Sequence, residues 1–303
     1  MERFPAARPD SGDAACKLTI IIPVYNEAAT FPVLLDEVRA LEVDKEIIVI
    51  DNVSTDGTRE LVAALDGQPG LVSVLQPANH GKGSSVRVGL ALARGEWVVI
   101  QDADLEYQPA DILHLLSEAE AQGLDAVFGS RLLAERPKVP WHHALGRDAL
   151  NLLFGLLYRA KMTDVATCYK LMRRAVAQEL VLDSLGFDLD YEIPCRLRRL
   201  GVTIAEVPVS YDPRTLETGK KLRWTDGLVA LRAILRYRRR PSRDMRLPGL
   251  GETVMLTDPP FGPCEATVVR VTSTHVVVEF ELAGRRARVA IRPLPAPASH
   301  AAP

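Results

Sequence analysis

Five short apolar runs, separated by segments with helical periodicity, constrain the fold of this chain more than any other feature. The runs lie at residues 17–23, 46–51, 71–76, 96–105 and 125–130. The segments between them include 28–41 and 109–121, which place apolar residues at the spacing of one helix face. Because the runs are apolar on both faces, they predict strands of a mostly parallel sheet that helices cover, an α/β fold.

A linker and a smaller unit are predicted after this α/β region. Prolines and glycines gather at 241–251, which is typical of a linker, and β-type runs with a turn at Gly284 follow it. The predicted boundaries are a flexible N-terminus at 1–16, an α/β domain at 17–240, the linker at 241–251, a small β-barrel-like all-β module at 252–294 and a disordered Pro/Ala-rich tail at 295–303.

Composition narrows the class of protein. Of 303 residues, 47% are hydrophobic and 25% are charged, as in soluble globular proteins, and the net charge of −2 gives no basic field for nucleic acid. Four cysteines without CxxC spacing fit a reducing compartment. No run reaches the roughly 18–20 apolar residues of a membrane span, and residues 1–16 lack the apolar core of a secretory leader. The sequence therefore predicts a cytoplasmic protein.

Polar residues follow three of the predicted strands. Residues 25–27, 51–52 and 102–104 each stand at the end of an apolar run. Ligands of open parallel sheets bind beyond the carboxyl ends of the strands. We therefore expect these residues to share one binding edge.

Two carboxylates stand out at that edge. Asp102 and Asp104 are two residues apart, and on an extended strand such side chains point to the same side. A divalent cation that prefers oxygen ligands, Mg²⁺ or Mn²⁺, would relieve their repulsion and bridge to a diphosphate. The alternative is a solvated acidic turn.

A glycine-containing turn at 79–84 precedes a predicted helix. It fits neither the Walker pattern nor GxGxxG, but Lys82 at a helix N-terminus can hold an anion. The alternative is a plain helix cap. The chain contains no GxSxG or HExxH motif, so no nucleophile signature is available.

Taken together, these motifs resemble a known family. PVYNE (23–27), DNVSTDGT (51–58), the segment 79–109 and GSR (129–131) resemble the family 2 glycosyltransferases of GT-A fold. The segments TDVATCYKLMRR (163–174), 201–214 and 218–228 resemble its dolichyl-phosphate mannosyltransferase-like branch, the polyprenyl-phosphate sugar synthases. The resemblance covers about residues 17–240 and does not include the β module.

The resemblance implies roles for individual residues. The expected nucleotide-sugar-binding residues are Pro23, Tyr25, Glu27, Asp51, Asn52, Lys82, Asp102, Ala103, Arg131, Arg214 and Lys220. The expected metal-binding residues are Asp102, Asp104 and Glu106. Asn52 occupies the second position of an acidic pair and can donate as well as accept a hydrogen bond, which leaves guanine and uracil both open.

The expected reaction is inverting transfer of a hexose from a nucleotide-diphosphate sugar, of GDP-mannose or UDP-glucose type, to a polyprenyl phosphate. A lipid phosphate is already ionised, whereas a sugar or metabolite hydroxyl needs a base. The expected catalytic residues are Asp104 and, for a soluble acceptor, Asp190 and Glu192, which alternatively cap the following helix. Less favoured interpretations are a nucleotidyltransferase and an inactive binding protein.

The predicted helix 225–239 carries a cluster of arginines. A basic amphipathic helix can lie on the anionic inner face of a membrane, which would make the protein peripheral. The alternative is a solvated helix face before the linker.

Overall fold

The computed structural model describes residues 15–134, 141–213, 225–238, 245–246, 250–256, 260–271, 275–291 and 294–295. Within them, the larger sheet has seven strands in the order β3-β2-β1-β4-β6-β5-β7. These strands are β1 (Cys16–Val24), β2 (Lys45–Asp51), β3 (Leu71–Leu75), β4 (Gly95–Ile100), β5 (Ala126–Ser130), β6 (Lys170–Arg173) and β7 (Ile204–Pro208). All pair in parallel except β6, which is antiparallel to both of its neighbours. The predicted α/β class with a mostly parallel sheet is confirmed.

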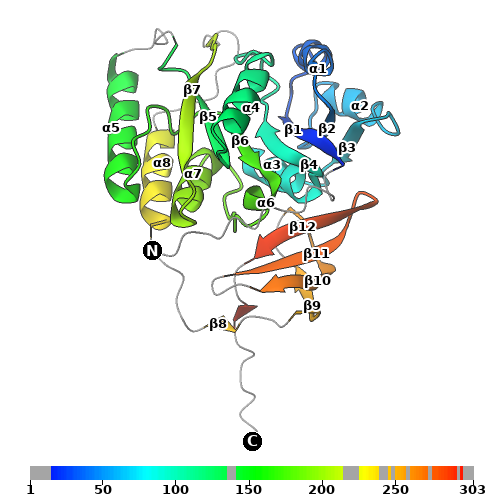
Figure 1. Ribbon diagram of the computed structural model, residues 1–303. Helices are drawn as coiled ribbons and strands as arrows, with labels where there is room; N and C mark the ends of the chain where they lie inside the picture. Colours follow the sequence, from blue (N-terminus) through cyan, green and yellow to red (C-terminus); the bar gives the residue numbers. More distant parts are fainter. Residues whose placement is uncertain are drawn as a thin grey trace, which may run out of the picture.

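Helices cover this sheet (Figure 1). They are α1 (Phe31–Arg39), α2 (Thr58–Ala63), α3 (Lys82–Leu92), α4 (Asp111–Ala121), α5 (Trp141–Tyr158), α6 (Arg174–Ala177), α7 (Leu189–Arg199) and α8 (Thr225–Arg236). α1 and α2 lie toward the β3 end, and α5, α7 and α8 lie beside β7. The helices α1 and α4 lie within the predicted helical segments 28–41 and 109–121.

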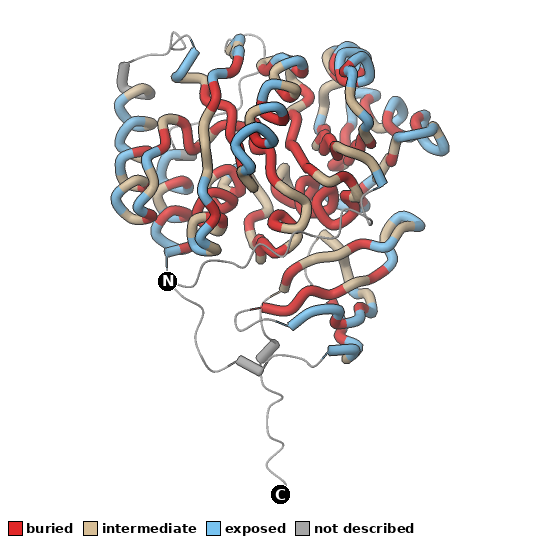
Figure 2. Tube along the Cα trace, in the orientation of Figure 1, coloured by how far each residue is buried: buried red, intermediate tan, exposed pale blue. Residues whose placement is uncertain are grey.

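The centre of the sheet forms the core. Leu18, Ile20, Ile21 and Ile22 of β1 are fully buried, because β1 is flanked by β2 and β4. α1 adds a buried face at helical spacing, made of Phe31, Leu34, Leu35 and Val38. Each such side chain contributes about 1.5–3 kcal/mol when it is buried. Figure 2 shows the buried stretches running through the middle of the larger unit.

The structure differs from the sequence-based prediction at β4. The strand ends at Ile100, and residues 101–106 form turns in which Leu105 has a φ of 61°. Asp102 and Asp104 therefore stand on a turn, and strand alternation is not what orients them. The apolar run was predicted too long because turn geometry leaves little trace in hydrophobicity.

The smaller unit is a four-stranded antiparallel sheet in the order β12-β11-β10-β9. Its strands are β9 (Thr253–Leu256), β10 (Cys264–Val271), β11 (Val276–Leu282) and β12 (Arg285–Ile291). A two-stranded pair, β8 (Met245–Arg246) with β13 (Leu294–Pro295), accompanies it. An all-β module is confirmed, but among the described residues the four strands have an open order rather than a barrel-like closure.

The β module packs against the edge of the larger sheet at which the parallel strands begin. Arg285 pairs with Glu46 at the start of β2, with 2.9 Å between Nη1 and Oε2. His275 Nε2 lies 2.7 Å from Oε2 of the buried Glu179, which also pairs with Arg270. Figure 1 shows the module on this side. These contacts lie away from the opposite edge, where the parallel strands end.

No helix among the described residues is long and apolar enough to cross a membrane.

Candidate active site

The parallel pairing of β1, β2 and β4 brings the predicted polar residues to one edge. Val24 pairs with Asp51, and Ile21 pairs with Ile100, so the chain segments that follow these strands emerge side by side. Pro23 and Tyr25 end β1, Asp51 and Asn52 end β2, and Ala103 lies in the turn after β4. The carboxyl edge of the sheet therefore carries the candidate site.

Three of the turns after these strands contain residues in the left-handed region. Asn26 has a φ of 55°, Val53 a φ of 64° and Leu105 a φ of 61°. For a β-branched residue such as Val53 this conformation is strained. Backbone strain of this kind is concentrated at ligand-binding sites, where the surrounding structure holds it in place.

Asp51 and Asn52 are built into the end of β2. The buried Asp51 carboxylate accepts hydrogen bonds from the backbone of Val53 and Ser54 and pairs with Arg59. The Asn52 amide donates to Asn79 Oδ1 at 2.9 Å and accepts from the backbone of His80 at 3.1 Å. An aspartate at position 52 could not make the first of these bonds. Asn52 thus joins β2 to the turn before α3.

Tyr25 and Glu27 follow β1, at the same edge of the sheet as Asp51 and Asn52. Tyr25 is 40% exposed, and Glu27 is half-buried and accepts a hydrogen bond from Thr30 Oγ1 at 2.7 Å. An exposed aromatic ring at a polar edge is suited to stacking on a flat heterocycle.

Lys82 begins α3 and lies at the centre of the site. Its Nζ is 2.9 Å from Asp102 Oδ2 and 3.4 Å from Asp190 Oδ2. Two glycines let the turn approach residues 184–186 this closely. A Cβ at Gly83 would lie 2.6 Å from the Ser184 carbonyl oxygen, and Gly81 has a φ of 92°. The predicted anion-holding turn thus places a cation against two carboxylates.

Asp190 is held by a second lysine as well. Lys170 of β6 is fully buried and places its Nζ 3.1 Å from Asp190 Oδ1. Burial alone would raise the pKa of Asp190, but Lys170 and Lys82 together lower it. Burial would likewise lower the pKa of Lys82, yet Asp102 and Asp190 raise it. Lys82 and Asp190 are therefore ionised at neutral pH, and Asp190 is a weak base.

Glu192 lies in the same helix but faces away from this cluster. Its fully buried carboxylate accepts hydrogen bonds from the backbone of Asp183 and Ser184 and pairs with Arg196 at 2.9 Å. These contacts hold the loop before α7. Glu192 therefore has a structural role at the start of α7. This is closer to the helix-capping alternative than to the role of a catalytic base.

Asp104 and Glu106 follow Asp102 in the turn. The backbone N–H of Glu106 donates to Asp104 Oδ1 at 3.2 Å, and Glu106 Oε2 accepts from the Tyr211 hydroxyl at 2.9 Å. The described residues contain no group of three or more His, Cys, Asp or Glu side chains that could hold a metal ion by themselves. Asp102 and Asp104 fit an ion such as Mg²⁺ or Mn²⁺ that takes one or two carboxylates and fills its other positions with phosphate oxygens and water.

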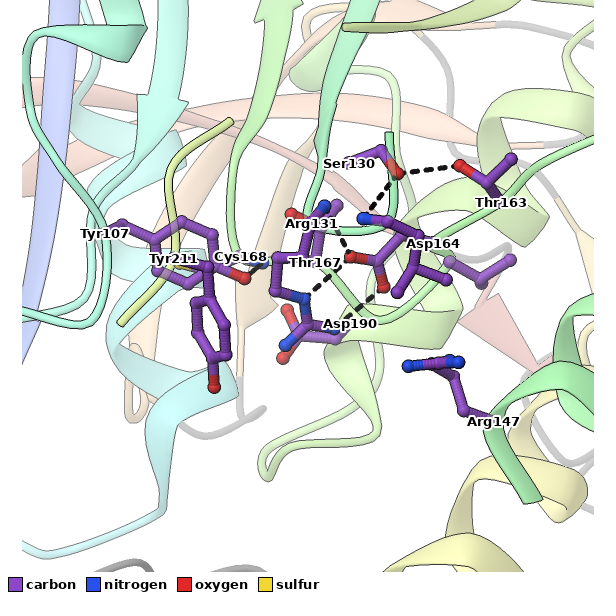
Figure 3. A network of polar contacts seen from close by, with 12 residues as sticks. Tyr107, Ser130, Arg131, Arg147, Thr163, Asp164, Thr167, Cys168, Asp190 and Tyr211 are labelled. Carbon is purple, nitrogen blue, oxygen red and sulfur yellow. Dashed lines mark hydrogen bonds and ion pairs between the residues drawn. The ribbon is translucent and has the colours of Figure 1, made fainter. Parts of the chain in front are cut away.

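Arg131 belongs to a network of polar contacts, drawn in Figure 3 together with Asp190. Its guanidinium makes a bidentate pair with the fully buried Asp164, with both N–O distances at 2.7 Å, and lies 5.0 Å from the centre of the Tyr211 ring. Thr163 next to Asp164 is hydrogen-bonded to Ser130 at 2.7 Å. The structure thus brings Arg131 beside Tyr211, whose hydroxyl holds Glu106.

Two of the predicted site residues lie outside the described residues, and three residues of the site were not predicted from the sequence. Arg214 and Lys220 lie outside the described residues. Sequence reasoning gave no role to Lys170, Asp164 or Tyr211. Lys170 was detectable, because a lysine inside an apolar strand must meet a buried partner. The partner, Asp190, is 20 positions away and becomes a neighbour only through the fold.

Comparison with known proteins fits this geometry. The model of the family described as Glycosyl transferase family 2 matches residues 19–181, which is more than half of the chain. The chain belongs to glycosyl transferase family 2. The match extends from β1 through α6 and includes Asp51, Lys82 and Asp102, so this part of the site lies within the matched region. The predicted resemblance to this family is confirmed.

Curated relatives include enzymes of the polyprenyl-phosphate branch. The chain is 41% identical over 171 residues to the undecaprenyl-phosphate 4-deoxy-4-formamido-L-arabinose transferase of Aeromonas hydrophila, covering 54% of this chain and 51% of the relative. It is 29% identical over 204 residues to the glycosyltransferase AglJ of Haloferax volcanii, covering 67% and 64%. The chain thus spans between half and two thirds of these relatives.

Solved structures of the same fold include a glucosyl-3-phosphoglycerate synthase from Mycobacterium tuberculosis. With Mn²⁺, UDP and phosphoglyceric acid bound, that structure has a TM-score of 0.56 and 20% identity, covering 85% of this chain and 89% of the other. A crystal structure of a mycobacterial protein has a TM-score of 0.58 and 21% identity, covering 86% and 85%. At this identity the likeness shows the fold, and it places this family 2 domain in the GT-A class.

Proposed function

We propose that this family 2 glycosyltransferase moves a hexose from a nucleotide-diphosphate sugar to a polyprenyl phosphate, with inversion at the anomeric carbon. The observation that carries the proposal is the state of Asp190, the carboxylate that faces Lys82. Two lysines hold it, and its pKa is lowered. A hydroxyl acceptor needs a base, whereas a phosphate acceptor arrives ionised.

The donor would occupy the edge formed by β1, β2 and β4. Tyr25 would stack on the base, and the end of β2 with Asp51 and Asn52 would set its position. Uridine is the first base to test, since fold relatives bind UDP. Guanine remains an alternative, because Asn52 can donate and accept.

The diphosphate would lie at the turn after β4. Asp102 and Asp104 would hold Mg²⁺ or Mn²⁺, which when bound supplies positive charge to the departing nucleoside diphosphate. Lys82 adds a second positive charge from α3. Preorganised charges of this kind often make the greatest single contribution to the rate enhancement of an enzyme.

Lys82 would change its ion-pair partner when the donor binds. Its Nζ pairs with Asp102 at 2.9 Å, so the cation already stands where the diphosphate would arrive. An incoming diphosphate and metal ion would compete for these two groups. Lys82 would then shift from the carboxylate to a phosphate oxygen, while Asp190 keeps its orientation through Lys170.

The acceptor phosphate would approach from the side of Arg131 and Tyr211. The bidentate pair with Asp164 fixes the guanidinium plane, and Tyr211 packs beside it. Arg214 and Lys220, three and nine positions further along the chain, are proposed as additional phosphate contacts.

A soluble acceptor is the second candidate. One observation favours it: the fold relatives include a synthase crystallised with phosphoglyceric acid, a small molecule that carries phosphate and carboxylate groups. Such an acceptor would use the same donor site. It would, however, present a hydroxyl, and the described cluster offers no unpaired base near Lys82 for that proton.

One assay separates the two. The protein is incubated with a panel of UDP- and GDP-hexoses, Mn²⁺ and either a polyprenyl phosphate or phosphoglyceric acid, and labelled sugar is counted in the lipid and water phases. We expect label in the lipid phase and a product of inverted anomeric configuration. Label confined to the water phase would support the soluble acceptor, and hydrolysis alone would contradict both.

A further inference from the structure

The outer face of α5 carries the most exposed apolar side chains of the glycosyltransferase domain. Leu145, Leu152 and Leu156 are 62%, 65% and 71% exposed, and among the described residues only Leu250, outside this domain, is a more exposed large hydrophobic residue. At 100° per residue the three leucines fall within about 40° of one another around the helix. They form a narrow stripe on the side of α5 that faces away from the core.

The opposite face of the same helix packs into the core. Phe154 and Tyr158 are buried, their rings stack at 4.9 Å, and the Tyr158 hydroxyl donates to the Ile234 carbonyl of α8 at 2.8 Å. A surface helix of a soluble domain normally turns polar residues outward. α5 is apolar on both faces, so its outer leucines require an explanation other than folding.

Basic residues border this stripe. Arg159 and Lys161 follow α5 and are exposed. A cavity of about 640 Å³ opens along the C-terminal half of α5. Leu152, Leu156, Arg159 and Lys161 all line it, so apolar and basic groups meet in one open hollow. Asp148 lines it as well and pairs with Arg147 at 2.9 Å.

The neighbouring helix α8 repeats the pattern. Leu228 and Leu235 are 53% and 48% exposed, and Arg232 between them is exposed as well. Residues 227–238 contain three arginines and no acidic residue. Since α8 packs against α5 at the β7 end of the sheet, both stripes belong to the same end of the molecule (Figure 1).

We propose that this face of α5 and α8 is a membrane-docking surface for an anionic lipid bilayer. The leucines would enter the interface while the arginines and Lys161 contact lipid phosphates. A second copy of the chain fits less well, because two such faces carry the same positive charge and would repel each other. The inference rests on the proposed function, since a lipid-linked acceptor has to be met at a bilayer.

The test measures flotation of the whole protein with vesicles, without donor or acceptor. Wild-type protein should float with vesicles of phosphatidylglycerol and phosphatidylcholine and much less with phosphatidylcholine alone. The double variant Leu152→Glu/Leu156→Glu should bind the anionic vesicles at least about tenfold more weakly, because two apolar anchors become like-charged with the lipid. Val33→Glu/Leu61→Glu, at the other end of the sheet, is the matched control and should bind as wild type.

Circular dichroism checks that both variants are folded, which their exposed positions favour. The proposal is overturned if wild-type protein binds anionic and neutral vesicles equally well. It is also overturned if the two double variants bind the anionic vesicles equally well. It is also overturned if light scattering shows a wild-type dimer that Leu152→Glu/Leu156→Glu dissociates, since the occupant is then a second copy.

Transfer to a polyprenyl phosphate in detergent separates this inference from the proposed function. The Leu152→Glu/Leu156→Glu variant should keep wild-type transfer there, because detergent removes the need to dock. Flotation without any transfer to lipid would leave the surface standing and contradict the proposed acceptor. Transfer in detergent without flotation would contradict the surface alone.

Discussion

At the scale of single residues, the site is defined by how charges are paired. Lys82 lies between Asp102 and Asp190, and Lys170 holds Asp190 from the other side. The opposite charges around them raise the pKa of Lys82 and lower the pKa of Asp190. Asp104, two positions after Asp102 in the same turn, belongs with it to the proposed metal site.

Asp104→Ala should therefore reduce transfer by about 100-fold or more, the usual size of a lost electrostatic contact to a developing charge. The measurement is initial rate with saturating donor, with and without a chelator. Glu118→Ala, at a half-buried position of α4, is the control. Full activity of Asp104→Ala in the presence of chelator would contradict the metal proposal.

Asp190→Asn should mainly reduce stability. It would leave the buried Lys170 without its carboxylate, which costs about 3–5 kcal/mol for a broken buried pair. Denaturant unfolding measures the loss. Combining the change with Lys170→Met, which removes the orphaned charge, should restore a large part of the free energy of unfolding; equal losses in the single and double variants would contradict the pairing.

The same residue sets the expected pH dependence. The pKa of Asp190 is lowered in the folded state, so its stabilising contribution is present above its unfolded pKa and is lost as pH falls through the folded value. Asp190 therefore titrates well below neutral pH.

With a phosphate monoester acceptor, the transfer rate should instead rise through about pH 6, where the phosphate loses its second proton. A profile of kcat against pH that is flat from about pH 5 to 7, roughly one unit either side of the second phosphate pKa, would contradict a phosphate nucleophile.

At the scale of elements, the turn before α3 determines where Lys82 stands. Gly83 packs against the backbone of residues 184–186, and a Cβ there would lie 2.6 Å from Ser184 O. The contact joins α3 to the loop that leads into α7. Two elements that are distant in the sequence are thus locked together at the site.

Gly83→Ala should lower the free energy of unfolding by about 1–3 kcal/mol, the usual cost of overpacking, and should weaken donor binding because Lys82 is displaced. Thermal unfolding and donor titration measure the two effects. Gly146→Ala in α5 is the matched control: a Cβ there meets nothing within 4 Å, so it should be neutral or stabilising by up to about 1 kcal/mol. Equal behaviour of the two variants would contradict the close packing.

At the scale of the whole molecule, the site and the β module lie at opposite edges of the sheet. The module is attached through Glu46 at the start of β2 and through Glu179 after α6. The proposed donor site lies where the strands end. The module also packs against α3, the helix that begins at Lys82, so independence of the two units is a prediction to test.

Glu179→Gln should test this separation. Removing the buried charge that faces His275 and Arg270 should lower stability by about 1–3 kcal/mol, as for a buried hydrogen bond to a charged group. The KM for the donor should stay the same, because the change is at the far edge. A several-fold change in donor KM without loss of stability would show that the module acts on the site.

The sequence alone determined the alternating apolar strands and helices, the break before the β module, and the polar residues at strand ends, because periodicity and composition act locally. It also pointed to Lys82 and Asp102, since a glycine turn and an acidic turn are local signals. Only the tertiary structure decided that β6 enters the sheet antiparallel, that Asp190 lies against two lysines while Glu192 turns away, and that the leucines of α5 face outward. These depend on which distant segments become neighbours, and no local pattern encodes the partner of a buried charge.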